Sequence, residues 1–348
     1  MKSTLFAFVA LASALACWPA SASPWLLRPG DLIVVGRYDF ESADEEYLDN
    51  TTAQPFPLAG RYDASTFSTT LRYGLLEDLE LELYLPIKQL SYSSDPVIVV
   101  PTTEADAFDY YQENILDFSQ SVRGLADIHM AARYQLFRSA VAGAFELRLK
   151  TPTGYDKPTG TFGNRPKSRE EFIARAEELT RPSNIQDDVA LGDGQLDLTP
   201  SILLGWATAS GTFARLDLGY RLRFGGAGDQ VIGGLRVGQS IGRRLLIYGG
   251  ADLEYAVQQG RIIGISVAAV DPTLPAEDYD SPDNFLFREL RLERDQLSVS
   301  GGAIFRATQS VEFNLGYTQT VWGRNTAQVR TVSVSIGIRT NILSPPDP

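Results

Sequence analysis

The stretch that decides the fold runs from Gly194 to Phe224, GQLDLTPSILLGWATASGTFARLDLGYRLRF. Apolar residues alternate with polar ones on both sides of a turn at 207–211, first from Leu196 to Trp206 and then from Leu216 to Phe224. A period of two predicts a β-hairpin with one apolar face and one charged face. In a soluble sandwich the apolar face would be core, whereas in a membrane barrel it would meet lipid and the charged face would line the lumen.

The first residues predict export. Residues 1–22 resemble a secretory signal, with Lys2 before an apolar run at Leu5–Ala16 and a cleavage site at Ala20-Ser21-Ala22. The mature chain is then expected to start at Ser23. The apolar run is too short for a membrane-spanning helix, and no later stretch reaches the roughly 18 apolar residues that such a helix needs.

Cysteine usage agrees with this reading. Cys17 is the single cysteine of the 348 residues. Cleavage after Ala16 would leave Cys17 to carry a lipid anchor, but the better cleavage site after Ala22 favours its removal with the signal. The mature chain would then have no disulfide framework, so its stability must come from sheet closure and packing. The net charge of −12 disfavours nucleic acid as a partner, because surfaces that bind nucleic acid are basic.

The alternating pattern recurs along the chain and predicts about twelve strands, an even number such as single-chain bacterial barrels have. The predicted strands are 32–40, 67–73, 79–88, 127–136, 141–150, 195–206, 215–224, 231–237, 245–257, 297–305, 311–321 and 331–339.

The connections between these strands predict the topology. Every second connection is a tight turn, at 74–77, 138–139, 207–211, 242–244 and 307–310. The long connections all fall at the opposite end, at 41–61, 91–124, 155–193 and 258–294. This segregation predicts an all-β, antiparallel up-and-down transmembrane β-barrel over 23–340 in the bacterial outer membrane, with short periplasmic turns and long extracellular loops. Residues 341–348 are expected to form a flexible tail.

Two of the long connections contain apolar segments. Ser168–Glu171 has the spacing of a capping box, and a stripe from Phe172 to Leu179 ends before Pro182, which predicts a short helix. Aromatic and aliphatic residues also gather in Phe108–Phe118. Either segment could fold over the barrel mouth as a lid, or the two could pack on each other.

The alternation along each strand predicts which charged residues face the lumen. Lys88 and Glu146 are on the lumen face but are not among the residues that we select for the solute path. As the solute path we select Glu80, Glu82, Arg133, Arg148, Lys150, Arg215, Asp217, Arg221, Arg223, Asp252 and Glu254. These charges would either line an aqueous path or pair across the lumen and fill it. A barrel of about twelve strands is intermediate in width between small barrels filled by side chains and open porins, so barrel size does not decide between the two. If the lumen conducts, the arginines favour anionic or aromatic-acid solutes.

The sequence gives little support for catalysis or metal binding. His129 is the single histidine, and the sequence shows no nucleophile set around it, so a structural role in the lumen is favoured over catalysis. Four aspartates near Gly194 lack the spacing of an EF-hand loop, which disfavours calcium; they are Asp187, Asp188, Asp193 and Asp197. We therefore expect no enzyme activity, cofactor or metal.

Short motifs in order along the chain resemble those of one family. They are Pro29-Gly30-Asp31-Leu32, Arg72-Tyr73-Gly74-Leu75, Asp78-Leu79-Glu80-Leu81, Gly124–Ile128, Lys150–Gly154, Leu191–Leu198 and Gly219-Tyr220-Arg221. This order resembles the outer-membrane barrel family called MetA-pathway of phenol degradation, a group of transporters. The resemblance implies a barrel that passes hydrophobic or aromatic compounds.

These observations predict an outer-membrane channel that passes small, aromatic or hydrophobic solutes through a charged lumen. The alternative is a closed barrel with a structural or adhesive role, exerted through its long loops. Membrane lipid and a small solute are the expected partners, and the sequence does not specify an oligomeric state.

Overall fold

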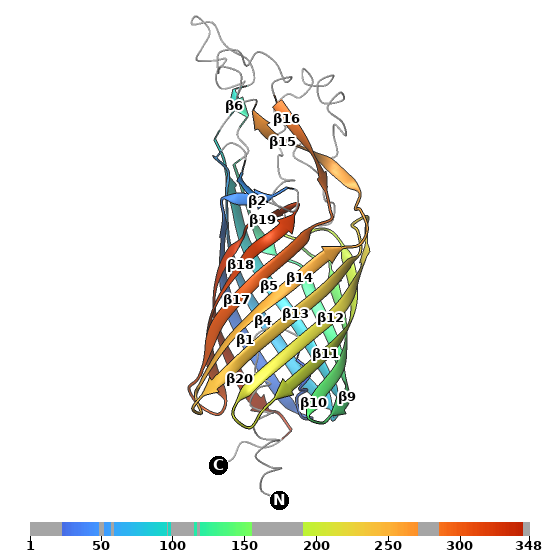
Figure 1. The fold of residues 1–348 in the computed structure, drawn as a ribbon, viewed down its shortest axis with the longest axis vertical. Helices are drawn as coiled ribbons and strands as arrows, with labels where there is room; N and C mark the ends of the chain where they lie inside the picture. Colours follow the sequence, from blue (N-terminus) through green and yellow to red (C-terminus); the bar gives the residue numbers. More distant parts are fainter. Residues whose placement is uncertain are drawn as a thin grey trace, which may run out of the picture.

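The protein folds as a closed antiparallel barrel (Figure 1), which confirms the predicted architecture. The computed structural model describes residues 23–48, 52–56, 59–95, 97–98, 115–116, 119–154, 191–270 and 285–343. The barrel strands are β1 (Asp31–Ala43), β4 (Arg61–Leu76), β5 (Leu79–Ser93), β9 (Ile128–Arg138), β10 (Val141–Thr151), β11 (Leu196–Ala207), β12 (Thr212–Phe224), β13 (Gln230–Ile241), β14 (Leu245–Ala256), β17 (Asp295–Arg306), β18 (Val311–Arg324) and β20 (Arg330–Asn341).

Each strand pairs with its neighbours along the chain, and β1 closes the barrel against β20 with Asp31 opposite Asn341 and Ser42 opposite Arg330. One barrel position is shared by two segments. The upper part of β5 pairs with β8 (Gln120–Leu125), its lower part pairs with β9, and residues 126–127 separate the two segments. Thirteen segments therefore form a barrel of twelve positions.

The two ends of the barrel differ (Figure 1). At the lower end, adjacent strands are joined by the tight turns 77–78, 139–140, 208–211, 242–244 and 307–310. The opposite end carries a small sheet of β2 (Glu45–Tyr47), β3 (Ala53–Pro55) and β19 (Thr326–Ala327). The pairs β15 (Ile262–Val270) with β16 (Phe285–Arg291) and β6 (Val97–Ile98) with β7 (Ile115–Leu116) stand above it. By the usual asymmetry of outer-membrane barrels, the tight turns mark the periplasmic end.

Some sequence-based expectations concern residues outside these ranges. They include the signal segment 1–22, the helix near 168–182, most of the apolar segment 108–118, and residues 344–348 of the tail. Within the described ranges there is no helix that is both long and apolar enough to cross a membrane.

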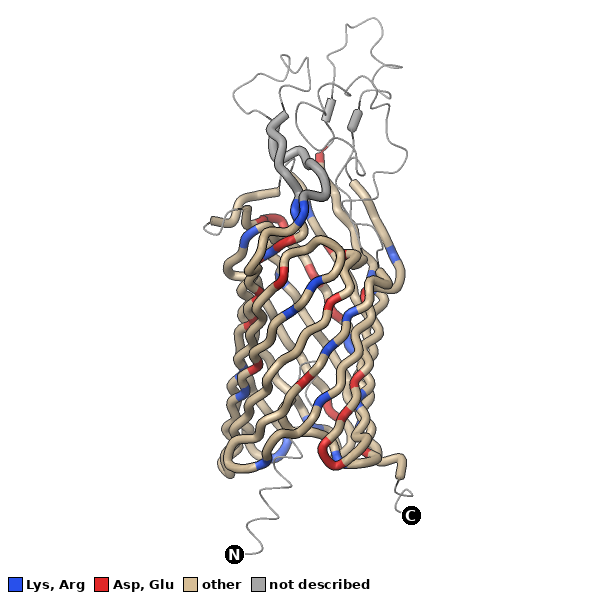
Figure 2. Tube along the Cα trace, turned by 90° about the vertical axis from the view of Figure 1, so that its right-hand side faces the viewer, with Lys and Arg blue, Asp and Glu red and all other residues tan. Residues whose placement is uncertain are grey.

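The alternating sequence places apolar side chains outside and polar side chains inside. In the hairpin of β11 and β12, Trp206, Leu218 and Phe224 are exposed on the outer surface, whereas Asp197 and Arg215 are buried in the interior. The tube in Figure 2 shows charged residues along the strands, and the burial of so many of them shows that they point inward. An apolar outer wall around a polar interior is the arrangement that lipid requires of a spanning barrel.

Candidate functional site

A network of three glutamates and three arginines lies along one side of the periplasmic half of the lumen, on the neighbouring strands β4, β5, β9 and β10. Strand register creates it, because Arg133 on β9 lies opposite Glu80 on β5 and opposite Glu146 on β10. The Arg133 guanidinium contacts Glu80 Oε1 and Glu82 Oε2 at 2.6 Å each, and Glu146 Oε2 at 2.5 Å. Its side chain is completely buried, with 0% exposed.

Two more arginines, one on each side of Arg133, complete the network and balance the charge of its glutamates. Arg72 on β4 contacts Glu80 at 2.8 Å, and Arg148 on β10 contacts Glu82 at 3.1 Å and Glu146 at 3.0 Å. Removing charges from water is costly unless each one is paired and hydrogen-bonded. Three carboxylates matched to three guanidinium groups satisfy this condition, so the charges can remain buried along this wall.

The segment before β1, residues 23–30, inserts into the same half of the lumen from the periplasmic end. Leu27 is 1% exposed and packs with Ile33, Val35 and Trp25, while its backbone N–H donates to Glu80 Oε2 at 2.9 Å. We call residues 23–30 the plug segment. This role could not be predicted from the sequence, because two leucines between Pro24 and Pro29 form no periodic pattern.

Further contacts fix the plug segment against the wall. Leu26 packs on a cluster formed by Ala144 and Leu203. The Gln135 side-chain amide donates to the Pro24 carbonyl at 3.0 Å. A Cβ added at Gly74 would lie 2.1 Å from the Arg28 carbonyl oxygen, so glycine is required there for the close approach of the segment.

A small cavity lies beside the plug segment. This cavity has a volume of about 10 Å³ and borders Ile33 and Val35, the residues on which Leu27 packs. It is lined by Ile33, Val35, Ile304, Glu312, Asn314, Ser335 and Gly337. That volume holds about one water molecule, so this cavity cannot pass an organic solute unless the plug segment or its neighbours move.

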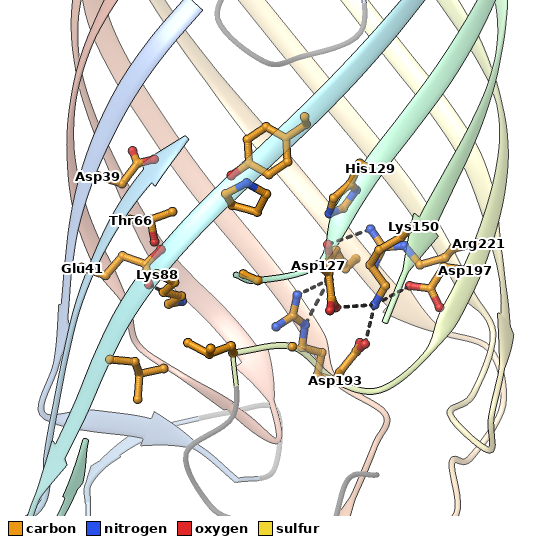
Figure 3. A pocket seen from close by; sticks show the side chains of 18 of the residues that line it. Asp39, Glu41, Thr66, Lys88, Asp127, His129, Lys150, Asp193, Asp197 and Arg221 are labelled. Atoms are coloured by element: carbon orange, nitrogen blue, oxygen red, sulfur yellow. Dashed lines mark hydrogen bonds and ion pairs between the residues drawn. The ribbon is translucent and has the colours of Figure 1, made fainter. Parts of the chain in front are cut away.

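Above the network, toward the loop end, the lumen widens into a pocket of about 830 Å³ (Figure 3). One wall, from β1, β4 and β5, contributes Asp39, Glu41, Tyr62, Tyr84 and Lys88. The other wall contributes His129, Arg148, Lys150, Asp197, Thr199 and Arg221 from β9, β10, β11 and β12, and Arg294 from the connection before β17. The pocket therefore has a tyrosine-bearing wall and an ionic wall.

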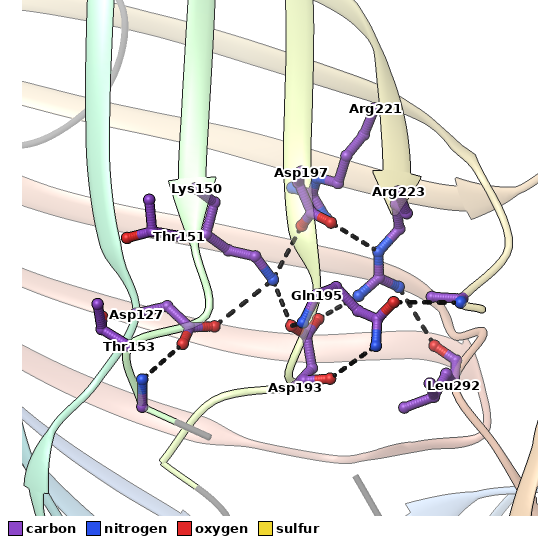
Figure 4. A network of polar contacts seen from close by, with 12 residues as sticks. Asp127, Lys150, Thr151, Thr153, Asp193, Gln195, Asp197, Arg221, Arg223 and Leu292 are labelled. Carbon is purple, nitrogen blue, oxygen red and sulfur yellow. Dashed lines mark hydrogen bonds and ion pairs between the residues drawn. The ribbon is translucent and has the colours of Figure 1, made fainter. Parts of the chain in front are cut away.

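A second network joins the ionic wall to the loop end (Figure 4). Lys150 contacts Asp127 at 3.5 Å and Asp197 at 2.8 Å, and it also contacts Asp193. Arg223 contacts Asp193 and, at 3.3 Å, Asp197. Asp193 belongs to the connection before β11. Burial raises the pKa of its carboxyl, but the positive charges of Lys150 and Arg223 outweigh burial and hold the pKa below its usual value.

The residues predicted for the solute path fall into three groups in the structure. Glu80, Glu82 and Arg133 belong to the buried network, and Arg148 joins that network to the pocket. Lys150, Arg221 and Glu254 line the pocket, whereas Arg223 is buried among its acidic partners. Arg215 pairs with Asp217 at 2.8 Å on β12, and Asp252 pairs with Arg236, outside the pocket lining.

The structure also places the residues considered for catalysis and metal binding. His129 lines the pocket, where its ring lies edge-on to that of Tyr84 with 5.5 Å between centroids. Asp193 and Asp197 are held by Lys150 and Arg223, while Asp187 and Asp188 lie outside the described ranges. Within the part of the chain that the structure describes, no group of three or more His, Cys, Asp or Glu side chains could hold a metal ion.

Comparison with known proteins identifies the fold. No family model matches the sequence, and no curated protein matches it. The chain is similar to the crystal structure of the COG4313 outer membrane channel from Pseudomonas putida F1, with 12% identity, a TM-score of 0.56, and coverage of 93% of this chain and 99% of that one. The chain has the fold of an outer-membrane β-barrel.

Two other solved structures share only a general likeness to this barrel. The translocator domain of autotransporter NalP from Neisseria meningitidis has 12% identity and a TM-score of 0.41, covering 97% of this chain and 98% of that one. The CymD monoaromatic hydrocarbon channel has 9% identity and a TM-score of 0.38, covering 90% and 89%. At these scores neither likeness carries an inference.

Proposed function

We propose that this protein is an outer-membrane channel that passes small organic solutes with aromatic or hydrophobic parts. The observation that carries the proposal is the pocket of about 830 Å³ inside a barrel with an apolar outer surface. This volume lies within the range of small-molecule sites, roughly 300–1,000 Å³. The proposed location is the outer membrane, and the proposed function involves no catalysis.

In this proposal the predicted path residues have different roles. Arg148, Lys150, Arg221 and Glu254 meet the solute in the pocket that they line. The buried network around Arg133 supports the wall below the pocket and remains intact. The plug segment is the barrier, because Leu26 and Leu27 pack inside the periplasmic half of the lumen, and its displacement opens the route to the periplasm.

A closed barrel is the second candidate, and the plug segment favours it. Residues 23–30 are fixed by apolar packing, by the hydrogen bond to Glu80 and by the hydrogen bond from Gln135. A barrel closed permanently in this way would act through its loops, in a structural or adhesive role, and the pocket would be a dead end.

Liposome swelling and single-channel recording test the two candidates. We would compare the full mature chain with a variant lacking residues 24–28, and with the matched substitutions Leu27→Gln and Arg28→Gln. Leu27 is buried, whereas Arg28 is exposed in the same segment. A channel predicts uptake of small aromatic solutes by the intact protein, with larger conductance for the deletion and for Leu27→Gln but not for Arg28→Gln. Zero uptake and zero conductance for every form would refute the channel.

A further inference from the structure

The ionic wall of the pocket presents arginines whose negative partners lie behind them. Arg148 donates from Nε and Nη2 to Glu146 at 3.0 and 3.2 Å, and its Nη1 lies 3.1 Å from Glu82. Both glutamates are buried and neither lines the pocket, whereas Arg148 does. A guanidinium has five N–H groups, so Arg148 keeps donors beyond these three contacts for a group in the pocket.

Two further arginines share a single carboxylate. Arg221 Nη2 donates to Glu254 Oε1 at 3.1 Å and its Nη1 donates to Gln230 at 2.7 Å. Arg294 donates from Nε and Nη2 to Glu254 Oε2 at 3.1 and 3.0 Å. Two positive charges on one negative charge leave this part of the wall locally positive. Asp127, Asp193 and Asp197 line the same pocket, where Lys150 and Arg223 pair with them.

Strand register brings Arg148 and Arg221 to the same level. Arg148 on β10 lies opposite Thr199 on β11, and Arg221 on β12 lies between the register pairs that flank Thr199. Thr199 also lines the pocket. Adjacent strands lie about 4.8 Å apart, so the two long arginine side chains can reach one anion on either side of the threonine hydroxyl.

The facing wall offers apolar surface with few open charges. Tyr62, Tyr84 and Tyr92 line it together with Pro86 and Leu90. The Tyr62 hydroxyl donates to Glu41 at 2.7 Å, and Lys88 contacts the same carboxylate at 3.1 Å. Glu41 is paired with Lys88, and Asp39 on the same wall is paired with Arg37 at 2.7 Å, so the phenol rings are the main uncharged feature that this wall presents to a ligand.

We propose that the pocket binds small amphipathic organic acids. The carboxylate lies between Arg148 and Arg221 beside Thr199, and the apolar or aromatic body packs against Tyr84 and Tyr62. Paired guanidinium groups suit a carboxylate because their N–H groups match its two oxygens. This inference rests on the proposed function, in which the pocket lies on the route of the solute. It adds the chemical class of that solute.

Binding of two probes of similar shape and different charge tests the assignment. Benzoate and benzyl alcohol would be titrated by calorimetry into the full mature chain in lipid nanodiscs. We expect benzoate to bind at least 10-fold more tightly, since charge-assisted hydrogen bonds are the stronger kind. Arg221→Gln should weaken benzoate binding by roughly 10-fold to 100-fold and leave benzyl alcohol unchanged. Thr199→Val should weaken it less, and Arg236→Gln, outside the pocket lining, should have no effect.

The outcomes separate this inference from the proposed function. Equal affinity for both probes, absence of benzoate binding, or an unchanged benzoate affinity in Arg221→Gln would overturn the binding site. Benzoate binding without uptake into liposomes would support the site and refute the channel. Uptake of benzoate and benzyl alcohol at equal rates, without selective binding, would support the channel and refute the site.

Discussion

Replacing Arg133 tests whether the buried charge network holds the barrel together. Arg133 is completely buried and contacts three carboxylates, at 2.6, 2.6 and 2.5 Å. In Arg133→Met, Glu80, Glu82 and Glu146 would share the two remaining guanidinium groups of Arg72 and Arg148. One buried negative charge is then uncompensated, and removing one partner of a buried ion pair costs about 3–5 kcal/mol. We expect the free energy of unfolding to fall by that amount.

Urea unfolding of the protein in lipid vesicles, followed by tryptophan fluorescence, measures this loss. Arg138→Ala is the matched control, because Arg138 is 53% exposed and meets Asp78 at 3.5 Å, so it should change the free energy of unfolding by less than about 1 kcal/mol. Adding Glu82→Gln to Arg133→Met restores the charge balance and should recover part of the loss. Equal stabilities of Arg133→Met and Arg138→Ala would show that the network contributes nothing, and the reasoning would fail.

Three further predictions follow from the wall, the plug segment and the N-terminus. Leu218 is 52% exposed on the outer face, so Leu218→Arg should lower the free energy of unfolding in lipid vesicles by about 2–4 kcal/mol if that face meets the bilayer core. A change near zero would show that Leu218 does not face the bilayer core. Gly74→Val should raise conductance in planar bilayers, because a Cβ there would meet the Arg28 carbonyl at 2.1 Å and push the plug segment away; unchanged currents would argue against a displaceable plug. The intact mass of the purified protein should correspond to a chain that begins at Ser23, and a mass that includes residues 1–22 would contradict the signal assignment.

The barrel could be predicted from the sequence because period-two alternation is a local signal. Each strand that crosses lipid must place apolar residues on one face, so the pattern survives in every strand. The ends of the strands were predicted less well. The second strand was expected at 67–73, whereas β4 spans Arg61–Leu76, and β5 continues to Ser93 to pair with β8. Once a strand passes beyond the bilayer, alternation is no longer required, and pairing alone defines its length.

The plug segment and the pairing of individual charges could not be predicted. Parity indicates that Glu80, Arg133 and Glu146 face inward, but their contact depends on the relative register of β5, β9 and β10. Turn lengths alone do not specify that register. The role of Leu27 depends on the shape of the closed lumen, which no local pattern describes. The tyrosine wall was missed for a related reason, since Tyr62 and Tyr84 lie on strands separated in sequence from the cationic residues that they face.

The burial of the plug segment has a consequence for the order of biogenesis. Ser23, the residue expected to follow the signal, is 1% exposed inside the closed barrel. In the closed barrel, where β1 is paired with β20, this residue is therefore shielded from solvent. If the signal is removed before Ser23, as the sequence predicts, we expect this cleavage to precede closure of the barrel around the new N-terminus. In that order of events, export would release the plug segment, and closure of the barrel around it would then seal the lumen.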